Sequence, residues 1–251
     1  FLQAYRVTGE ARYLEIVERA IPFFTRDLPV LLDEPDRLCL GYQPVPMTMR
    51  VMDVSILVGA VLAQFGELSG DLRYRDTATR LTAYVVGQQT EQGAWWYTDP
   101  PEDSPISHDN YHTGFILDAL HRYQRATGDD QWEEQYRHGL AFYRERLFAA
   151  DGAPRWMHDR EWPHDIHGAA QGILTFSRHL DSDDDLVMKI IDWCLDNMHD
   201  DRGFFYYQQR KHFTIKTHLL RWCNGWMSRA LSAYLLASAG SATTAKEEQP
   251  Q

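Results

Sequence analysis

Cysteine and long apolar runs are scarce in this sequence of 251 residues. The three cysteines, Cys39, Cys194 and Cys223, are too few for a disulfide framework and too scattered for a CxxC metal site. We therefore expect a reducing, cytoplasmic compartment. The longest apolar run, from Ile56 to Ala63, is far short of the ~20 residues that a membrane helix needs, so we expect no transmembrane segment.

Positive charge is scarce as well. The chain has 25 Lys and Arg residues against 36 Asp and Glu residues, which gives a net charge of −11. This balance argues against polyanionic partners such as nucleic acid unless cations cluster locally. No local basic patch stands out, and we expect neither a nucleic-acid partner nor a cofactor.

No Pro/Gly/Ser-rich linker divides the chain, and its length allows one sizeable core. We expect a single domain over residues 1–240 and a small, polar, disordered tail from Ser241 to Gln251. Phe1 opens inside a helical pattern, from which we expect that the true start of the protein is missing.

A turn of Gly followed by an acidic residue recurs along the chain, at Gly9, Gly70 and Gly128, with spacings of 61 and 58 residues. An Ala/Gly/Leu-rich helix precedes the turn, and a helix with a single charged stripe follows it. Alternating buried and amphipathic helices predict an all-α (α/α)6 toroid, in which inner helices form a barrel and outer helices clad it. The inner helices are expected near Met49–Leu68, Tyr111–Tyr123, Asp165–Leu180 and Thr217–Ala237, with a truncated one at the start.

Chemistry-bearing side chains gather at the start of two predicted inner helices, in the stretches Ser107–Phe115 and Trp162–Gln171. We expect both helix starts to open onto one pocket. Asp109 and Asp165 form a natural acid and base pair for glycosidic bonds, although each Asp is also explained as a helix cap. Their separation, and with it inversion or retention, stays open.

Histidine offers a second chemistry. His112 and His167 would assist the carboxylates, or act themselves as general acid and base in proton abstraction next to a uronate carboxylate. Arg50 or Arg221 would hold that carboxylate. The other substrate-binding groups expected at this end of the barrel are Tyr42, Asp53 as a reserve carboxylate, His164, Gln171 and His218.

Aromatic residues are abundant, with 8 Trp, 13 Tyr and 11 Phe, many of them in loop-like segments. Flat apolar rings over a cleft bind sugar faces or isoprenoid chains, although single loop aromatics also serve as packing between helices. Trp96, Tyr111 and Trp162 are the predicted stacking platforms.

A metal site is an alternative. His108 and His112 are spaced i, i+4, and His164 and His167 are spaced i, i+3, which would put ligands on one helix face. The His-Glu-x-x-His pattern is absent, and Pro163 argues against a helix at His164. We therefore predict no metal.

Several runs of the sequence together resemble a family of six-hairpin, glycosidase-like proteins often encoded among bacterial and archaeal polysaccharide-biosynthesis genes. The runs are Gln43–Pro46, Asp53–Ser55, Asp109–Phe115, Leu147–Pro154 and Trp162–Gln171. The resemblance implies the (α/α)6 toroid, a carbohydrate context and the absence of about one N-terminal hairpin. The wider superfamily includes inverting glycosidases, unsaturated glucuronyl hydrolases, sugar epimerases and polysaccharide lyases.

The predicted function is binding of an oligosaccharide or lipid-linked glycan in an acidic, aromatic cleft, with hydrolysis or another modification of it. One alternative is a non-catalytic glycan-binding subunit of a polysaccharide assembly complex, in which Asp109 is only a cap. Another is a terpene-cyclase-like enzyme, for which the run Asp183-Asp184-Asp185 is the only near match to an acidic magnesium motif.

Overall fold

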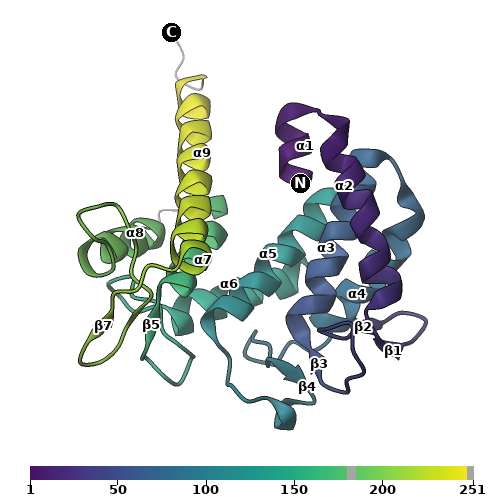
Figure 1. The fold of residues 1–251 in the computed structure, drawn as a ribbon, viewed down its shortest axis with the longest axis horizontal. Coiled ribbons are helices and arrows are strands. Elements are labelled where there is room, and N and C mark those ends of the chain that lie inside the picture. Colours follow the sequence, from purple (N-terminus) through teal and green to yellow (C-terminus); the bar gives the residue numbers. More distant parts are fainter. Residues whose placement is uncertain (180–184, 248–251) are drawn as a thin grey trace. The chain divides into compact units, whose positions relative to one another are not determined.

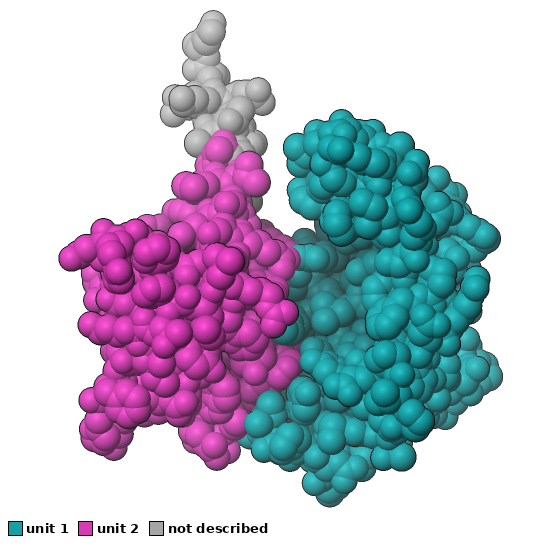
Figure 2. All heavy atoms as spheres, viewed as in Figure 1, with its two compact units in different colours: residues 1–107, 115–141 teal, residues 108–114, 142–251 magenta. Residues whose placement is uncertain are grey.

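The computed structural model describes residues 1–179 and 185–247, with side chains to residue 239, and most of them are helical (Figure 1). The chain divides into two compact units, coloured separately in Figure 2. Unit 1 comprises Phe1–Ser107 and Phe115–Ala141, and unit 2 comprises His108–Gly114 and Phe142–Gln251.

Unit 1 combines helices with two short antiparallel strand pairs. Its elements are α1 (Leu2–Thr8), α2 (Ala11–Pro22), β1 (Val30–Asp33), β2 (Leu38–Leu40), β3 (Arg50–Val51), α3 (Met52–Ser69), α4 (Arg75–Val86) and β4 (Thr98–Asp99), with short π or 3-10 turns at Phe23–Asp27, Leu72–Tyr74 and Pro101–Asp103. Strand β1 pairs with β2, and β3 pairs with β4. The core forms where α3 packs on α4 and on α2.

Helix α3 is an inner helix, as its lack of charge predicts. Gly59 allows the close approach of α4, because a Cβ there would lie 2.8 Å from Thr82 Oγ1 and 3.0 Å from the Ala78 carbonyl oxygen. Among the described residues, α3 alone is long and apolar enough to cross a membrane, with 18 residues and a mean hydropathy of 1.3. Because 61% of it is buried inside the protein, packing accounts for its apolar composition.

Unit 2 is built around α7. Its elements are β5 (His164–Asp165), α7 (Ile166–Phe176), a 3-10 turn (Ser177–His179), α8 (Leu186–Asn197), β6 (Gln208–Gln209), β7 (Thr214–Ile215), a π-helical turn (Leu220–Gly225) and α9 (Trp226–Glu247). Every residue of α7 is buried, and α7 packs on α8 and α9. The strands form one antiparallel sheet in the order β5-β6-β7. Helix α5 (Asn110–Thr127) begins in unit 2, and α6 (Glu133–Leu147) ends in it.

The C-terminal helix differs most from the prediction. A helix is predicted from Thr217, whereas residues 217–219 are not helical and a π-helical turn precedes Trp226. Strand β7, which ends at Ile215 just before this segment, is held extended by its pairing with β6. Disorder is predicted from Ser241, whereas α9 extends to Glu247. Leu180, Asp183 and Asp184 lie outside the described residues.

Candidate active site

Asp109 and His112 form a carboxylate–imidazole pair at the start of α5. Oδ2 of Asp109 lies 2.9 Å from Nδ1 of His112 and accepts a hydrogen bond from the His112 backbone N–H at 3.3 Å. The Asp109 side chain is only 4% exposed, whereas that of His112 is 17% exposed. Trp156 fixes this helix start, since its carbonyl accepts the Asn110 N–H. Asp109 is therefore both a cap and the orienting partner of a more accessible imidazole.

Asp165 caps α7, and its carboxylate is fully engaged. Oδ1 accepts hydrogen bonds from the His167 N–H at 2.9 Å and from Trp222 Nε1 at 3.1 Å, and Oδ2 accepts one from Gln208 Nε2 at 2.6 Å. Burial raises the pKa of Asp165, against the opposing effect of these donors. One buried carboxyl group thus ties together α7, the sheet and the π-helical turn.

Four rings pack around the start of α7, and we call them the His167 cluster: Tyr111, His167, Trp222 and Trp226. The His167 ring stacks on Tyr111 with centroids 5.2 Å apart and planes 4° from parallel. Its centroid lies 4.3 Å from that of Trp222 and 4.4 Å from that of Trp226. These contacts bring the two predicted helix starts together, because Tyr111 belongs to α5 and His167 to α7.

Burial lowers the pKa of His167 to about 3, and nearby positive charge at His112, Arg229 and Arg221 adds to the effect. The imidazole of His167 is therefore neutral at neutral pH. It is therefore a weak base, and it carries no proton to donate as a general acid at neutral pH.

Three other predicted site residues of unit 2, Trp162, His164 and Gln171, make packing or hydrogen-bond contacts within the protein, and their predicted roles stay predictions. His164 Nδ1 lies 2.7 Å from the Pro154 carbonyl oxygen, and its ring centroid is 4.0 Å from that of Trp162. Burial lowers the pKa of His164. The Gln171 amide donates to the Gly114 carbonyl at 3.1 Å and to a Thr175 hydroxyl, so it is committed to helix packing.

Arg221 and His218, by contrast, are exposed. The His218 ring stacks on Phe204 with centroids 4.8 Å apart. Arg221 lines an open hollow of about 460 Å³ together with Tyr207, Leu219, Leu220 and Trp222. Trp222 thus borders this hollow and also belongs to the His167 cluster.

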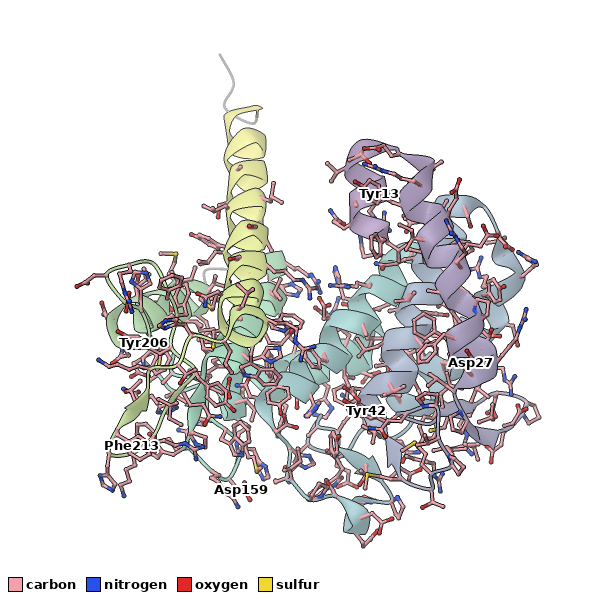
Figure 3. The ribbon with its side chains drawn as sticks, in the orientation of Figure 1. Tyr13, Asp27, Tyr42, Asp159, Tyr206 and Phe213 are labelled. Carbon is pink, nitrogen blue, oxygen red and sulfur yellow. The ribbon has the colours of Figure 1, made fainter. Side chains whose placement is uncertain are left out.

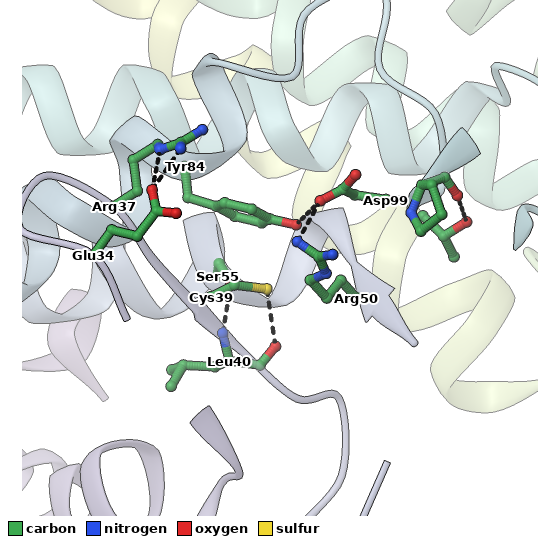
Figure 4. A network of polar contacts seen from close by, with 10 residues as sticks. Glu34, Arg37, Cys39, Leu40, Arg50, Ser55, Tyr84 and Asp99 are labelled. Carbon is green, nitrogen blue, oxygen red and sulfur yellow. Dashed lines mark hydrogen bonds and ion pairs between the residues drawn. The ribbon is translucent and has the colours of Figure 1, made fainter. Parts of the chain in front are cut away.

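The predicted site residues Tyr42, Arg50, Asp53 and Trp96 belong to unit 1. Arg50 makes a 2.9 Å ion pair with Asp99, which also accepts a hydrogen bond from the Tyr84 hydroxyl (Figure 4). Tyr42 is 48% exposed (Figure 3), whereas Asp53 is buried. A pocket that gathers these four residues with those of unit 2 stays a prediction.

The metal alternative requires each pair of closely spaced histidines to lie on one helix face, and the structure does not show this. His108 precedes the first residue of α5, and His164 lies in β5, so neither pair of histidines shares a helix face. The helices begin later than that spacing requires because Asp109 and Asp165 cap them. Across residues 1–179 and 185–239, whose side chains the structure describes, no three His, Cys, Asp or Glu side chains are grouped to hold an ion.

Trp222, Trp226 and Gln208 are contributors that the sequence analysis did not single out. The two tryptophans stand at i, i+4 directly after Arg221, a spacing that puts them on one helix face and is a usable signal. Gln208 gives no local signal, because its partner Asp165 is 43 positions away.

No family model matches this sequence, and no curated protein matches it. Among solved structures, a sugar epimerase from a ruminal bacterium aligns with 95% of this chain and 72% of its own, at a TM-score of 0.72 and 14% identity. The cellobiose 2-epimerase of Bacillus thermoamylovorans B4167 aligns with 95% of this chain and 69% of its own, at 0.73 and 12%. An unsaturated glucuronyl hydrolase specific for heparin aligns with 94% and 72%, at 0.69 and 17%. These similarities confirm the predicted fold class, the all-α (α/α)6 toroid.

Proposed function

We propose that this protein is a carbohydrate-modifying enzyme in which His112, oriented by Asp109, transfers protons to and from a sugar. The observation that carries the proposal is the 2.9 Å contact between Asp109 Oδ2 and His112 Nδ1. A carboxylate on one ring nitrogen fixes the tautomer and makes the other nitrogen a better base. The fold, shared with sugar epimerases and a glucuronyl hydrolase, supports a carbohydrate substrate by analogy.

The reaction that we favour is proton transfer at a sugar carbon next to a carbonyl or carboxylate group. The base takes the carbon-bound proton, and the electron pair of the broken C–H bond moves into the neighbouring C=O group to form an enolate. Return of a proton to the opposite face gives the epimer, whereas loss of the β-oxygen substituent gives elimination. His167, whose pKa is about 3, is too weak a base for this step, and its neutral ring stacks on Tyr111 beside the proposed base.

The substrate that we propose is an oligosaccharide or a lipid-linked glycan of polysaccharide biosynthesis, handled in the cytoplasm. Tyr111 lies beside His112, Trp222 packs edge-on against Tyr111, and both supply flat apolar faces for a sugar ring. The buried free thiols of Cys39, Cys194 and Cys223 fit a reducing compartment.

Glycoside hydrolysis is the second candidate. Burial raises the pKa of Asp165, which is what a general acid requires. The glucuronyl hydrolase neighbour supports it by fold. We rank it second because both oxygens of Asp165 already accept hydrogen bonds from the protein, which suits a positioning role.

The test is proton NMR of candidate sugars incubated with the protein in D2O. Reprotonation of the enolate exchanges the reacting C–H for C–D, whereas elimination replaces it with a C=C bond. We expect His112→Gln and Asp109→Asn to lower either rate by about a hundredfold or more. His199→Gln, a histidine of the same unit that packs on Phe205, is the control and should leave the rate unchanged.

Three outcomes would redirect the proposal. An unchanged rate in His112→Gln contradicts it. Cleavage of a glycosidic bond with neither deuterium incorporation nor a new C=C bond favours hydrolysis by the carboxylates. Glycan binding without any turnover indicates the non-catalytic binding subunit.

A further inference from the structure

One segment of unit 2 has a positive net charge, although the chain as a whole is negative. From Arg202 to Lys246 the sequence holds seven Lys or Arg residues and no Asp or Glu, although the whole chain has 36 acidic and 25 basic residues. The expectation that no local basic patch exists is therefore wrong for this segment. An acidic protein that concentrates cations in one region creates a local site of attraction for anions.

The cations of this segment are exposed. Arg210 and Lys211 lie in the turn of the β6–β7 hairpin, next to Phe213, which is 63% exposed (Figure 3). Lys216 and Arg221 are exposed on the chain that follows β7. None of these four cations forms an ion pair with a carboxylate in the described part of the chain. Arg202 differs, since it pairs with Asp200 at 2.7 Å.

Aromatic rings accompany these cations, and together they form what we call the basic–aromatic face. Lys216 Nζ lies 5.2 Å from the centre of the Tyr206 ring, and the hollow beside Arg221 has Tyr207 and Trp222 in its lining. A guanidinium beside flat rings suits an anionic sugar, because Arg binds a carboxylate through two hydrogen bonds while the ring covers the apolar sugar face. The face consists of Arg210, Lys211, Phe213, Lys216, Arg221, Tyr206, Tyr207 and Trp222.

Two hydrogen bonds join this face to the proposed site. Trp222, in the lining of the hollow, donates to Asp165 and contacts the His167 ring. Gln208, on the strand that leads into the hairpin, also donates to Asp165. The positive charge of Arg221 reaches His167, whose pKa it helps to lower. An anion held in the hollow would therefore lie next to the His167 cluster.

We propose that the basic–aromatic face binds the carboxylate of an acidic oligosaccharide, with Arg221 as the residue that donates to it. This inference rests on the proposed function and names its substrate class as a uronate-containing glycan. A hollow lined by one guanidinium suits a single carboxylate rather than a long polyanion. The 36 acidic residues outside the segment would repel an extended nucleic acid or an anionic membrane surface.

The experiment measures binding without turnover, by isothermal titration calorimetry at low and high salt. The probes are tetrasaccharides of galacturonate, mannuronate and hyaluronan, each beside its carboxyl-reduced form. We expect one acidic probe to bind and its carboxyl-reduced form to bind about tenfold more weakly or worse. Arg221→Gln should lose this preference, whereas Lys189→Gln, a cation on α8 paired with Asp185, should keep it.

Equal binding of acidic and carboxyl-reduced probes, or an unchanged preference in Arg221→Gln, would overturn the inference. Tighter binding of a single-stranded oligonucleotide or of anionic phospholipid vesicles would overturn it in favour of that partner. Binding is measured separately from turnover, and a glycan can bind in the His112→Gln variant as well. The calorimetry therefore tests the acidic-glycan site even if the proposed proton transfer fails. A variant that fails to fold is identified by its thermal unfolding, and Arg221→Lys then replaces Arg221→Gln.

Discussion

The indole of Trp222 donates a 3.1 Å hydrogen bond to Oδ1 of Asp165 across 57 positions of sequence. The same carboxylate caps α7 and accepts a hydrogen bond from Gln208 on β6. One buried group therefore positions a wall of the hollow, the start of the central helix of unit 2 and the hairpin that carries the exposed cations. Changes at Asp165 should act on all three.

The first prediction compares two substitutions at Asp165. Asp165→Ala leaves the donors of Trp222 and Gln208 without an acceptor, and we expect a loss of roughly 2–4 kcal/mol in the free energy of unfolding. Asp165→Asn keeps an oxygen for Trp222 and should cost less. Its amide can donate to Gln208 Oε1 after rotation of the Gln208 amide, an oxygen that is buried without a hydrogen-bond partner among the described residues.

The carboxyl group of Asp165 also makes the stability of the protein depend on pH. Burial raises the pKa of folded Asp165 above its ordinary value near 3.8, so the folded state binds this proton more readily than the unfolded state. The stability that Asp165 contributes is therefore present at low pH and is lost as pH rises through the folded pKa. Urea unfolding from about pH 4 upward should show wild type losing stability relative to Asp165→Asn. Parallel curves would contradict the prediction.

The second prediction concerns acid sensitivity at His167. Its pKa falls from 6.5 to about 3 on folding, so the unfolded state binds more protons between these values. The stability that neutral His167 contributes is fully present above pH 6.5. It falls as the solution is acidified, by at most about 1.4 kcal/mol per pH unit. His167→Phe keeps a ring against Tyr111 and should flatten this slope. His212→Gln, which replaces an exposed histidine, should not change it.

The third prediction separates backbone strain from steric overlap at two glycines. Gly152 and Gly203 have nearly equal φ angles, 91° and 90°. A Cβ at Gly152 would lie 2.4 Å from the Lys189 carbonyl carbon, whereas nothing lies within 4 Å of one at Gly203. We expect Gly203→Ala to cost about 1–2 kcal/mol from conformation alone, and Gly152→Ala to cost clearly more. Equal losses of thermal stability would show that the contact with α8 is unimportant.

The fourth prediction concerns Arg50, whose guanidinium is paired with Asp99 inside unit 1. We expect Arg50→Gln to lower thermal stability modestly, because the pair is partly exposed and solvent screens it. Tyr84→Phe should cost about 1 kcal/mol, since it removes the second hydrogen bond to Asp99. Neither change should alter the affinity for an acidic glycan, as calorimetry can check. A loss of affinity in Arg50→Gln alone would instead support the predicted role of Arg50 in substrate binding.

The sequence by itself determined the helical repeat and its capping residues. Gly70 and Gly128 adopt φ angles of 73° and 68° directly after α3 and α5, as a left-handed helix end requires, and their spacing marks the helical pairs. Asp109 and Asp165 cap helices as their position before an apolar helix predicts. These features are local, so that a few neighbouring residues are enough to specify them.

Only the tertiary structure decided which side chains meet. Asp165 is engaged by Trp222 and Gln208, and Arg50 by Asp99, through pairings over 43 to 57 positions that no periodic pattern encodes. The burial of His167 among three rings, which sets its pKa, likewise depends on how α5, α7 and α9 pack. Local sequence fixes backbone conformation, but hydrogen-bond partners and desolvation depend on residues that become neighbours only after folding.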